Sequence, residues 1–140
     1  MAKVPRILFV CTANSARSQM AEGFARYYAG DLVKVDSAGT NPTQLNPYAV
    51  QVMNEAGIDI SHQTCDSLSS KKLEDFDHVI TVCGDARETC PVLPPHIESE
   101  HWPLSDPARA RGHPQEVARV FRVIRNQIED RVKDFLARIL

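Results

Sequence analysis

The sequence lacks any long apolar run. Its longest, residues 7–11, is five residues, whereas a bilayer-spanning helix needs about 20 and the apolar part of a secretory signal roughly 7–15. We therefore predict neither a membrane span nor an export signal, and we expect a cytoplasmic protein.

Net charge and cysteine are also scarce. Sixteen Lys and Arg against eighteen Asp and Glu leave a formal charge of -2, so we expect no nucleic acid or membrane partner, and any anion site must be local. Four cysteines are too few for a disulfide scaffold, and in the cytoplasm they should be thiols. The five histidines show no metal-ligand spacing, so we expect no metal catalysis.

Strand-like and helix-like patterns alternate along the 140 residues with no linker between them. We predict one domain, 1–140, of the α/β class: a doubly wound, four-stranded parallel sheet in the order 2-1-3-4 with helices on both faces. The expected strands are 7–10, 33–37, 78–82 and 98–102, and the expected helices are 18–28, 47–57 and 114–139. Ligands of such sheets bind at the carboxyl ends of the strands.

A cysteine and an arginine separated by five residues follow the first expected strand directly. A loop between a strand and a helix can aim its N–H groups at an oxyanion, which Arg17 can then close on with two parallel hydrogen bonds. Cys11 would be a thiolate nucleophile at the base of this cradle, and Ser18 could hydrogen-bond to its sulfur. The expected oxyanion-binding residues are Thr12, Ala13, Asn14, Ser15, Ala16, Arg17 and Ser18. The alternative is a small buried cysteine and a solvated arginine.

The segment 7–26 resembles the phosphate-binding loop of the low-molecular-weight protein tyrosine phosphatase fold. With the later motifs, the chain is similar over nearly its whole length to the thioredoxin-coupled arsenate reductases. These motifs are Gly57-Ile58-Asp59-Ile60-Ser61, Val82-Cys83-Gly84-Asp85, Cys90-Pro91, Pro94-Pro95-His96, His101-Trp102 and Asp106-Pro107-Ala108-Arg109-Ala110. The sequence departs from the family at Ala13, where glycine is common, at Ala16, where some members carry cysteine, and at Cys65, which we interpret as a passive thiol.

The resemblance implies a relay of three thiols. Cys11 attacks arsenate, Cys83 displaces arsenite by forming a disulfide with Cys11, and Cys90 then forms a disulfide with Cys83, which thioredoxin reduces. Were the segment between Cys83 and Cys90 helical, their α-carbons would lie about 10 Å apart, beyond the roughly 7 Å a disulfide tolerates, so it must loop or unwind. The alternative for these two thiols is a structural role.

The resemblance also implies an acid and a cation. Asp106, held on a stiff turn by Pro107, would protonate the departing oxygen, although an Asp-Pro turn without any catalytic part is common. In the family that the chain resembles, a potassium site is formed at the positions of Asn14, Glu22, Ser37 and Asp66. All four residues carry oxygen, which a hard cation prefers. The alternative is that they are caps and surface residues, with Asn14 and Ser37 bracing the loop. No tightly bound cofactor is expected beyond this potassium ion.

Three functions remain open from the sequence. The first is reduction of arsenate to arsenite by a monomer, with thioredoxin as partner and phosphate or sulfate as oxyanion mimics. The second is hydrolysis of aryl phosphates through Cys11, Arg17 and Asp106, which does not require Cys83 or Cys90. The third is a non-enzymatic oxyanion-binding or redox-sensing module, which steady turnover would exclude.

Overall fold

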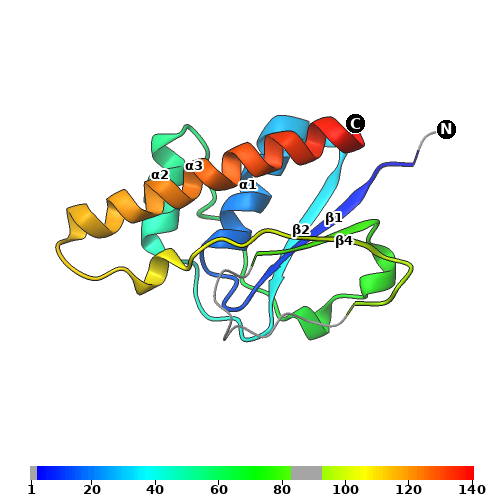
Figure 1. Ribbon diagram of the computed structural model, residues 1–140, viewed down its shortest axis with the longest axis horizontal. Helices are drawn as coiled ribbons and strands as arrows, with labels where there is room; N and C mark the ends of the chain where they lie inside the picture. The colour runs from blue at the N-terminus through cyan, green and yellow to red at the C-terminus, as the bar shows by residue number, and fades with distance from the viewer. Residues whose placement is uncertain (1–2, 83–92) are drawn as a thin grey trace.

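A parallel sheet forms the centre of the computed structural model, which describes residues 3–82 and 93–140. Its strands are β1 (Arg6–Cys11), β2 (Lys34–Gly39), β3 (His78–Thr81) and β4 (Glu98–His101), in the order β2-β1-β3-β4 (Figure 1). β1 lies between two partners, and all five residues that follow Arg6 in it are buried, as its continuous apolar run predicts. The predicted α/β class and strand order are confirmed.

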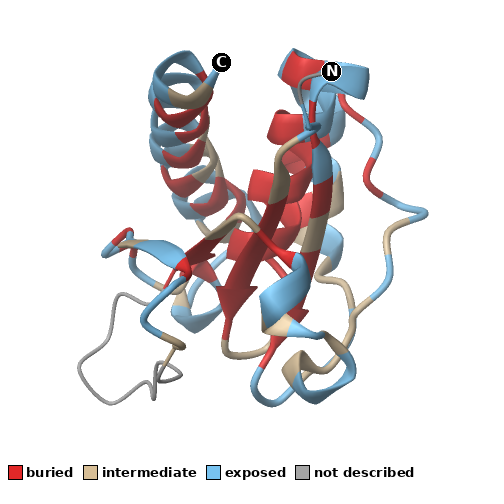
Figure 2. Cartoon of the chain, turned by 90° about the vertical axis from the view of Figure 1, so that its right-hand side faces the viewer, coloured by how far each residue is buried: buried red, intermediate tan, exposed pale blue. Residues whose placement is uncertain are grey.

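The α-helices found in residues 3–82 and 93–140 all lie on one side of this sheet. They are α1 (Arg17–Ala29), α2 (Pro47–Glu55) and α3 (Pro114–Ile139). Their apolar faces share a single core cluster with Ile7, Phe9 and Ile80 of the strands, and Figure 2 shows a stripe of buried residues along the helix that leads to the C-terminus, α3. The spacing of three and four residues along α3 predicts this stripe, because such residues share one side of a helix.

The opposite face carries a smaller core cluster that includes Leu8, Val10 and Val79. In the described part of the chain it is covered by two short 3-10 helices, η2 (Leu68–Ser70) and η3 (Leu73–Asp75), through Leu68 and Leu73. Helical cover on both faces was expected, and on this face it consists of single turns. The remaining 3-10 helices are η1 (Gly30–Leu32) and η4 (Pro107–Arg109).

The ends of α2 follow the predicted signals. The Asn46 side chain accepts a hydrogen bond from the Tyr48 N–H (2.8 Å), and Pro47 is the first helical residue. The helix ends at Glu55, and Gly57 then takes a φ of 84°, which residues with a Cβ adopt only under strain. No helix within residues 3–82 and 93–140 is long and apolar enough to cross a membrane.

The parallel direction of the strands determines at which end of the sheet the candidate site residues lie. All four strands run the same way, so their carboxyl ends lie together at one edge of the sheet. Cys11 ends β1 there, and the segment that follows β4 leads from the same edge to Asp106 and η4.

Candidate active site

The loop between β1 and α1 forms a cradle at this edge. α1 begins at Arg17, and its N-cap residue Ala16 makes no side-chain capping bond. The first N–H groups of a helix have no partner within it, and together they favour an anion. The start of α1 therefore directs backbone N–H groups toward the end of the loop.

The loop's carbonyl groups face away from the cradle, toward the segment that follows β2. The C=O and N–H groups of one peptide unit point in opposite directions. Each loop carbonyl that accepts a hydrogen bond from outside therefore directs the N–H of the following residue into the cradle. The bonds are Thr40 N to Cys11 O (3.3 Å), Asn41 N to Thr12 O (2.8 Å), Thr43 N to Ala13 O (3.0 Å) and Asn46 N to Ser15 O (2.9 Å). The segment 40–46 thus fixes the cradle from outside.

Gly39 allows this close approach. A Cβ at this position would lie 2.6 Å from the Thr12 carbonyl oxygen and 2.9 Å from the Asn14 nitrogen, both backbone atoms. Any other residue at the end of β2 would push the loop away, so Gly39 is a requirement of the site that the sequence motif did not include.

The Cys11 sulfur lies at the base of the cradle and has two hydrogen-bond partners. It accepts from the Asn14 N–H (3.2 Å) and lies 2.9 Å from the Ser18 hydroxyl oxygen. Both partners are completely buried, and the cysteine is 2% exposed. The predicted contact between Ser18 and the sulfur is present.

Asn14 adopts the left-handed conformation of the loop, with a φ of 50°. Ala13, where the family often has glycine, does not take a positive φ. Asparagine tolerates a positive φ better than most residues with a Cβ, so the residue type at position 14 suits the left-handed backbone that the loop requires there. The departure at Ala13 therefore costs the backbone nothing.

Arg17 is held at the rim by the segment after β4. Its guanidinium donates to the Leu104 carbonyl (3.1 Å) and lies 3.9 Å from the Asp106 carboxylate. The Asp106 carboxylate also accepts from the Ala108 N–H (3.0 Å), which fixes it at the start of η4 as the Asp-Pro turn predicts. The predicted nucleophile, arginine and acid therefore surround one pocket.

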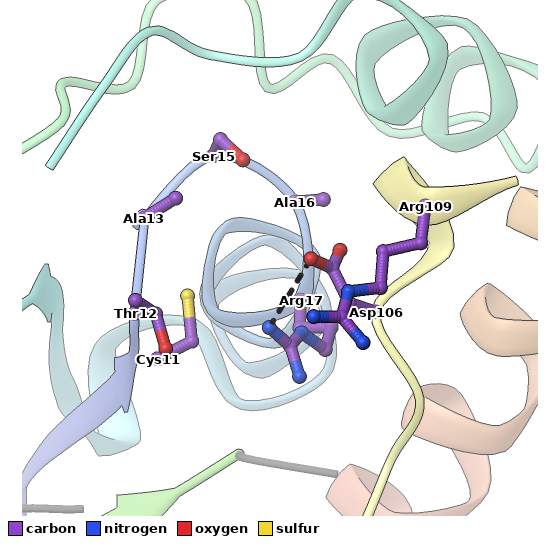
Figure 3. Close-up of a pocket in the computed structure, with 8 residues that line it drawn as sticks. All are labelled: Cys11, Thr12, Ala13, Ser15, Ala16, Arg17, Asp106 and Arg109. Carbon is purple, nitrogen blue, oxygen red and sulfur yellow. Dashed lines mark ion pairs between the residues drawn. The ribbon is translucent and has the colours of Figure 1, made fainter. Parts of the chain in front are cut away.

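This pocket has a volume of about 170 Å³. A cavity needs roughly 10–15 Å³ of such space to hold one water molecule, so this pocket has room for a tetrahedral oxyanion. The lining residues in the described part of the chain include none that is aromatic; they are Cys11, Thr12, Ala13, Ser15, Ala16, Arg17, Asp106 and Arg109 (Figure 3). Of the predicted oxyanion-binding residues, Asn14 and Ser18 lie behind the pocket and contact the sulfur.

Comparison with known proteins gives the same assignment over nearly the full length. Residues 6–140 match the family model of the low molecular weight phosphotyrosine protein phosphatases. The chain belongs to this family. Among its relatives, an arsenate reductase of Bacillus subtilis is 52% identical over 129 residues, which is 92% of this chain and 93% of the relative.

Solved structures of the family agree with the fold described above. An arsenate reductase in a phosphate-binding state superposes with a TM-score of 0.83 at 37% identity, over 97% of this chain and 99% of the other. A thioredoxin-dependent arsenate reductase of Corynebacterium glutamicum superposes with a TM-score of 0.77 at 29% identity, over 99% of this chain and 63% of the other. The predicted family membership is confirmed.

Gln19 braces the phosphatase-family loop from the side of α1. It is completely buried, and its amide donates to the Asn14 carbonyl (2.9 Å) and the Thr64 carbonyl (2.8 Å). Its own amide oxygen accepts from Gln63 (2.7 Å). Sequence reasoning missed Gln19, and the one available signal was a glutamine on the buried side of a helix.

The four residues expected to bind potassium lie together, but their oxygens are already engaged. The Ser37 hydroxyl donates to Glu22 (2.6 Å) and accepts from the Asn14 amide (3.0 Å), while the Asn14 amide oxygen accepts from the Asp66 N–H (2.8 Å). A potassium ion at this position would therefore have to share these oxygens with the hydrogen bonds that they already make.

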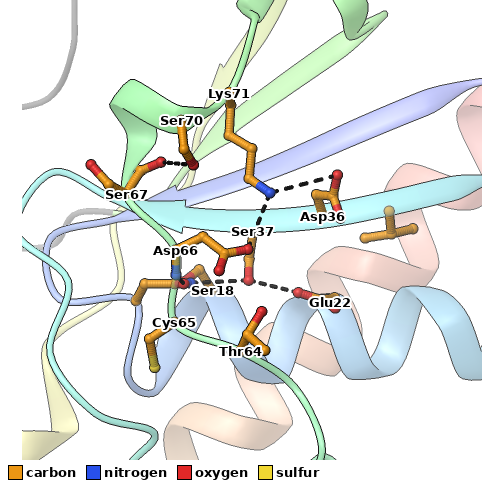
Figure 4. A network of polar contacts seen from close by, with 12 residues as sticks. Ser18, Glu22, Asp36, Ser37, Thr64, Cys65, Asp66, Ser67, Ser70 and Lys71 are labelled. Carbon is orange, nitrogen blue, oxygen red and sulfur yellow. Dashed lines mark hydrogen bonds and ion pairs between the residues drawn. The ribbon is translucent and has the colours of Figure 1, made fainter.

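Two positively charged side chains, Lys71 and Arg26, lie beside this network. Lys71 lies 3.1 Å from the Asp66 carboxylate and 3.9 Å from that of Asp36 (Figure 4). Arg26 lies 2.9 Å from the Glu22 carboxylate. The protein itself thus supplies positive charge beside these acidic groups.

Cys65 lies beside the site without lining the pocket. Its sulfur is a weak partner of the Gln19 amide, at 3.7 Å. Burial, and then the neighbouring Asp66 carboxylate, raise the pKa of the Cys65 thiol, which makes it a poor nucleophile near neutral pH. Cys83 and Cys90 lie outside the described residues.

Proposed function

We propose that this protein reduces arsenate to arsenite. One observation carries the proposal: a buried cysteine with two hydrogen-bond partners lies at the base of a pocket sized for a tetrahedral oxyanion and lined by an arginine and a carboxylic acid. Such a pocket could support either arsenate reduction or phosphate ester hydrolysis, and the similarity to arsenate reductases over most of the chain favours arsenate reduction.

The first step uses the geometry of the cradle. The Cys11 thiolate attacks arsenic, and a bond from arsenic to oxygen breaks on the opposite side, toward Asp106. Asp106 gives its proton to the departing group, which is a hydroxyl of the bound arsenate and therefore leaves as water. The inward N–H groups and Arg17 stabilise the negative charge on the remaining oxygens during this exchange.

The second step is the transfer of electrons. The Cys83 thiolate attacks the Cys11 sulfur, the sulfur–arsenic electron pair leaves with arsenic as arsenite, and a Cys11–Cys83 disulfide forms. The Cys90 thiolate then attacks Cys83, which releases the Cys11 thiolate and forms a Cys83–Cys90 disulfide. The dithiol of thioredoxin reduces this disulfide and is itself oxidised. We also propose that the protein acts in the cytoplasm, a reducing compartment in which thioredoxin is present as the electron donor.

Hydrolysis of aryl phosphates is the second candidate. Family membership and the trio of Cys11, Arg17 and Asp106 favour it, since these groups suffice for ester cleavage. Against it stands the lack of an aromatic wall among the described lining residues, because an aryl group gains from such packing.

A coupled assay tests the proposal. Arsenate should drive NADPH consumption in the presence of thioredoxin and thioredoxin reductase, and glutathione with glutaredoxin should support much less. The Cys11→Ser variant serves as the control for background. If the parent leaves NADPH unchanged and hydrolyses an aryl phosphate through Cys11, the phosphatase candidate takes the place of reduction.

Potassium binding is a separate proposal with its own test. A potassium ion would have to replace the Lys71 ammonium beside Asp66, so the Lys71→Ala variant should respond to potassium more strongly than the parent. Thermal stability is measured in potassium chloride and in a bulky organic chloride at the same ionic strength, since binding to the native state alone stabilises it. Indifference of both proteins to the cation would refute the site.

A further inference from the structure

A second arginine lines the pocket, and the proposed mechanism gives it no part. Arg109 ends η4, the single turn that begins just after Asp106, and its N–H donates to the Asp106 carbonyl (3.2 Å). Pro107 and the bond from the Ala108 N–H to the Asp106 carboxylate stiffen the same turn. The backbone that fixes the acid therefore also fixes the position from which Arg109 extends.

The side chain of Arg109 reaches the mouth of the pocket. Figure 3 shows the Arg109 guanidinium beside the Arg17 guanidinium and the Asp106 carboxylate. All three groups lie across the pocket from the Cys11 sulfur. An attack by Cys11 places the departing oxygen on the side opposite to the sulfur. Arg109 thus lies where the outermost oxygen of a bound tetrahedral anion must be.

The charge of the pocket depends on this residue. Of the described lining residues, Arg17 and Arg109 are cations and Asp106 is the one carboxylate. Without Arg109, Arg17 would be the one cation among these lining residues, and an ionised Asp106 carboxylate would balance its charge and leave little net attraction for a doubly charged anion. A guanidinium also offers a planar fork of donors that matches two oxygens of such an anion.

We propose that Arg109 is a second oxyanion-binding residue, which makes the pocket selective for a free inorganic tetraoxyanion over an organic phosphate ester. In a free anion the outermost oxygen bears no organic group and can accept from the Arg109 fork. In an ester this oxygen is bonded to carbon and is a weaker acceptor, and the organic group must pass the side chain. The inference deepens the proposed function, since arsenate is an anion of the favoured class.

Equilibrium binding to the reduced protein tests this role apart from arsenate reduction. Calorimetric titration with inorganic phosphate and with phenyl phosphate is carried out on the parent, Arg109→Gln, Arg109→Lys and Arg111→Gln. Arg111 is exposed and follows in the same loop, and glutamine at this position keeps a donor for the carbonyls of Arg109 and Ala110 that Arg111 now contacts. Arg111→Gln therefore makes the same change of charge outside the pocket.

Arg109→Gln should weaken phosphate binding about tenfold, which is the size expected for one hydrogen bond to a charged group, and should weaken phenyl phosphate binding less than about twofold. Arg109→Lys should recover part of the loss for phosphate, because it keeps the charge, and Arg111→Gln should match the parent. The proposal is overturned if Arg109→Gln binds phosphate as Arg111→Gln does. It is equally overturned if phenyl phosphate loses as much as phosphate, which would mean that the guanidinium stacks on the ring, or if lysine recovers nothing.

These outcomes are independent of arsenate reduction. A parent protein that fails to reduce arsenate but loses phosphate affinity in Arg109→Gln would refute the proposed function and leave the oxyanion role of Arg109 in place. A parent that reduces arsenate, with phosphate binding unchanged in Arg109→Gln, would refute the role of Arg109 alone.

Discussion

The Ser18 hydroxyl should control the reactivity of Cys11, because the network behind the pocket determines where its proton points. The Asp66 N–H can only donate, so the atom of the Asn14 side chain that faces it is the amide oxygen. The Asn14 amide nitrogen then donates to the Ser18 oxygen (2.7 Å). This leaves the Ser18 proton for the Cys11 sulfur at 2.9 Å, where it stabilises a thiolate.

The Ser18→Ala substitution removes one of two hydrogen bonds to this sulfur and leaves the one from the Asn14 N–H. A hydrogen bond to a charged group contributes about 1.5–3 kcal/mol, and 1.4 kcal/mol is tenfold, so alkylation of Cys11 at pH 7 should slow by roughly 10- to 100-fold. The fold should survive, since the Asn14 amide keeps Ser37 as an acceptor.

The assay is alkylation by iodoacetamide, followed by mass spectrometry of the tryptic peptide 7–17, which contains Cys11 and no other cysteine. Ser15→Ala is the matched control, because it removes a hydroxyl that lines the same pocket (Figure 3), whereas the two hydrogen bonds to the sulfur described above come from Asn14 and Ser18. If Ser18→Ala is alkylated within about twofold of the parent rate, the hydroxyl does not donate to the sulfur and the reasoning fails.

Three further predictions concern the rim and the surface. Arg17→Lys should lower arsenate turnover by more than about tenfold, because an ammonium cannot supply the planar fork, and turnover within about twofold of the parent would contradict this. Asp106→Asn keeps the bond from the Ala108 N–H but has no carboxylic proton, so turnover should fall about 100- to 10,000-fold; an unimpaired variant would make Asp106 a turn residue alone. The hydrogen bond from Arg122 lowers the pKa of Glu55 to about 2, so the stabilisation is present above the ordinary value of about 4.3 and is lost as pH falls toward 2. The melting temperatures of the parent and Glu55→Gln should therefore differ most near pH 7 and converge near pH 2, and a constant difference would refute the linkage.

The parts of the site that are local in sequence could be predicted from it. The apolar run of β1, the spacing of Cys11 and Arg17 and the helical pattern that follows define the cradle, and the Asp-Pro turn fixes the position of Asp106, whose role as an acid is a prediction from the resemblance. These features depend on neighbours within a few residues, where propensity and sterics dominate.

The braces of the site could not be predicted, because they join segments far apart in the chain. The ties from residues 40–46 to the loop and the bond from Gln19 to the Thr64 carbonyl follow from tertiary packing and leave no periodic pattern. The same holds for Lys71, whose ion pairs with Asp66 and Asp36 place a side-chain ammonium beside the oxygens expected to bind potassium.

The thiol relay is the central claim, and the products of a single exposure to arsenate test it most directly. The parent, Cys11→Ser, Cys83→Ser and Cys90→Ser are exposed once without thioredoxin, trapped in acid and analysed by mass spectrometry, with arsenite measured in parallel. The account predicts no product for Cys11→Ser, an arsenic adduct on Cys11 without arsenite for Cys83→Ser, and about one arsenite per chain with a Cys11–Cys83 disulfide for Cys90→Ser. Full thioredoxin-coupled turnover by both Cys83→Ser and Cys90→Ser would contradict it.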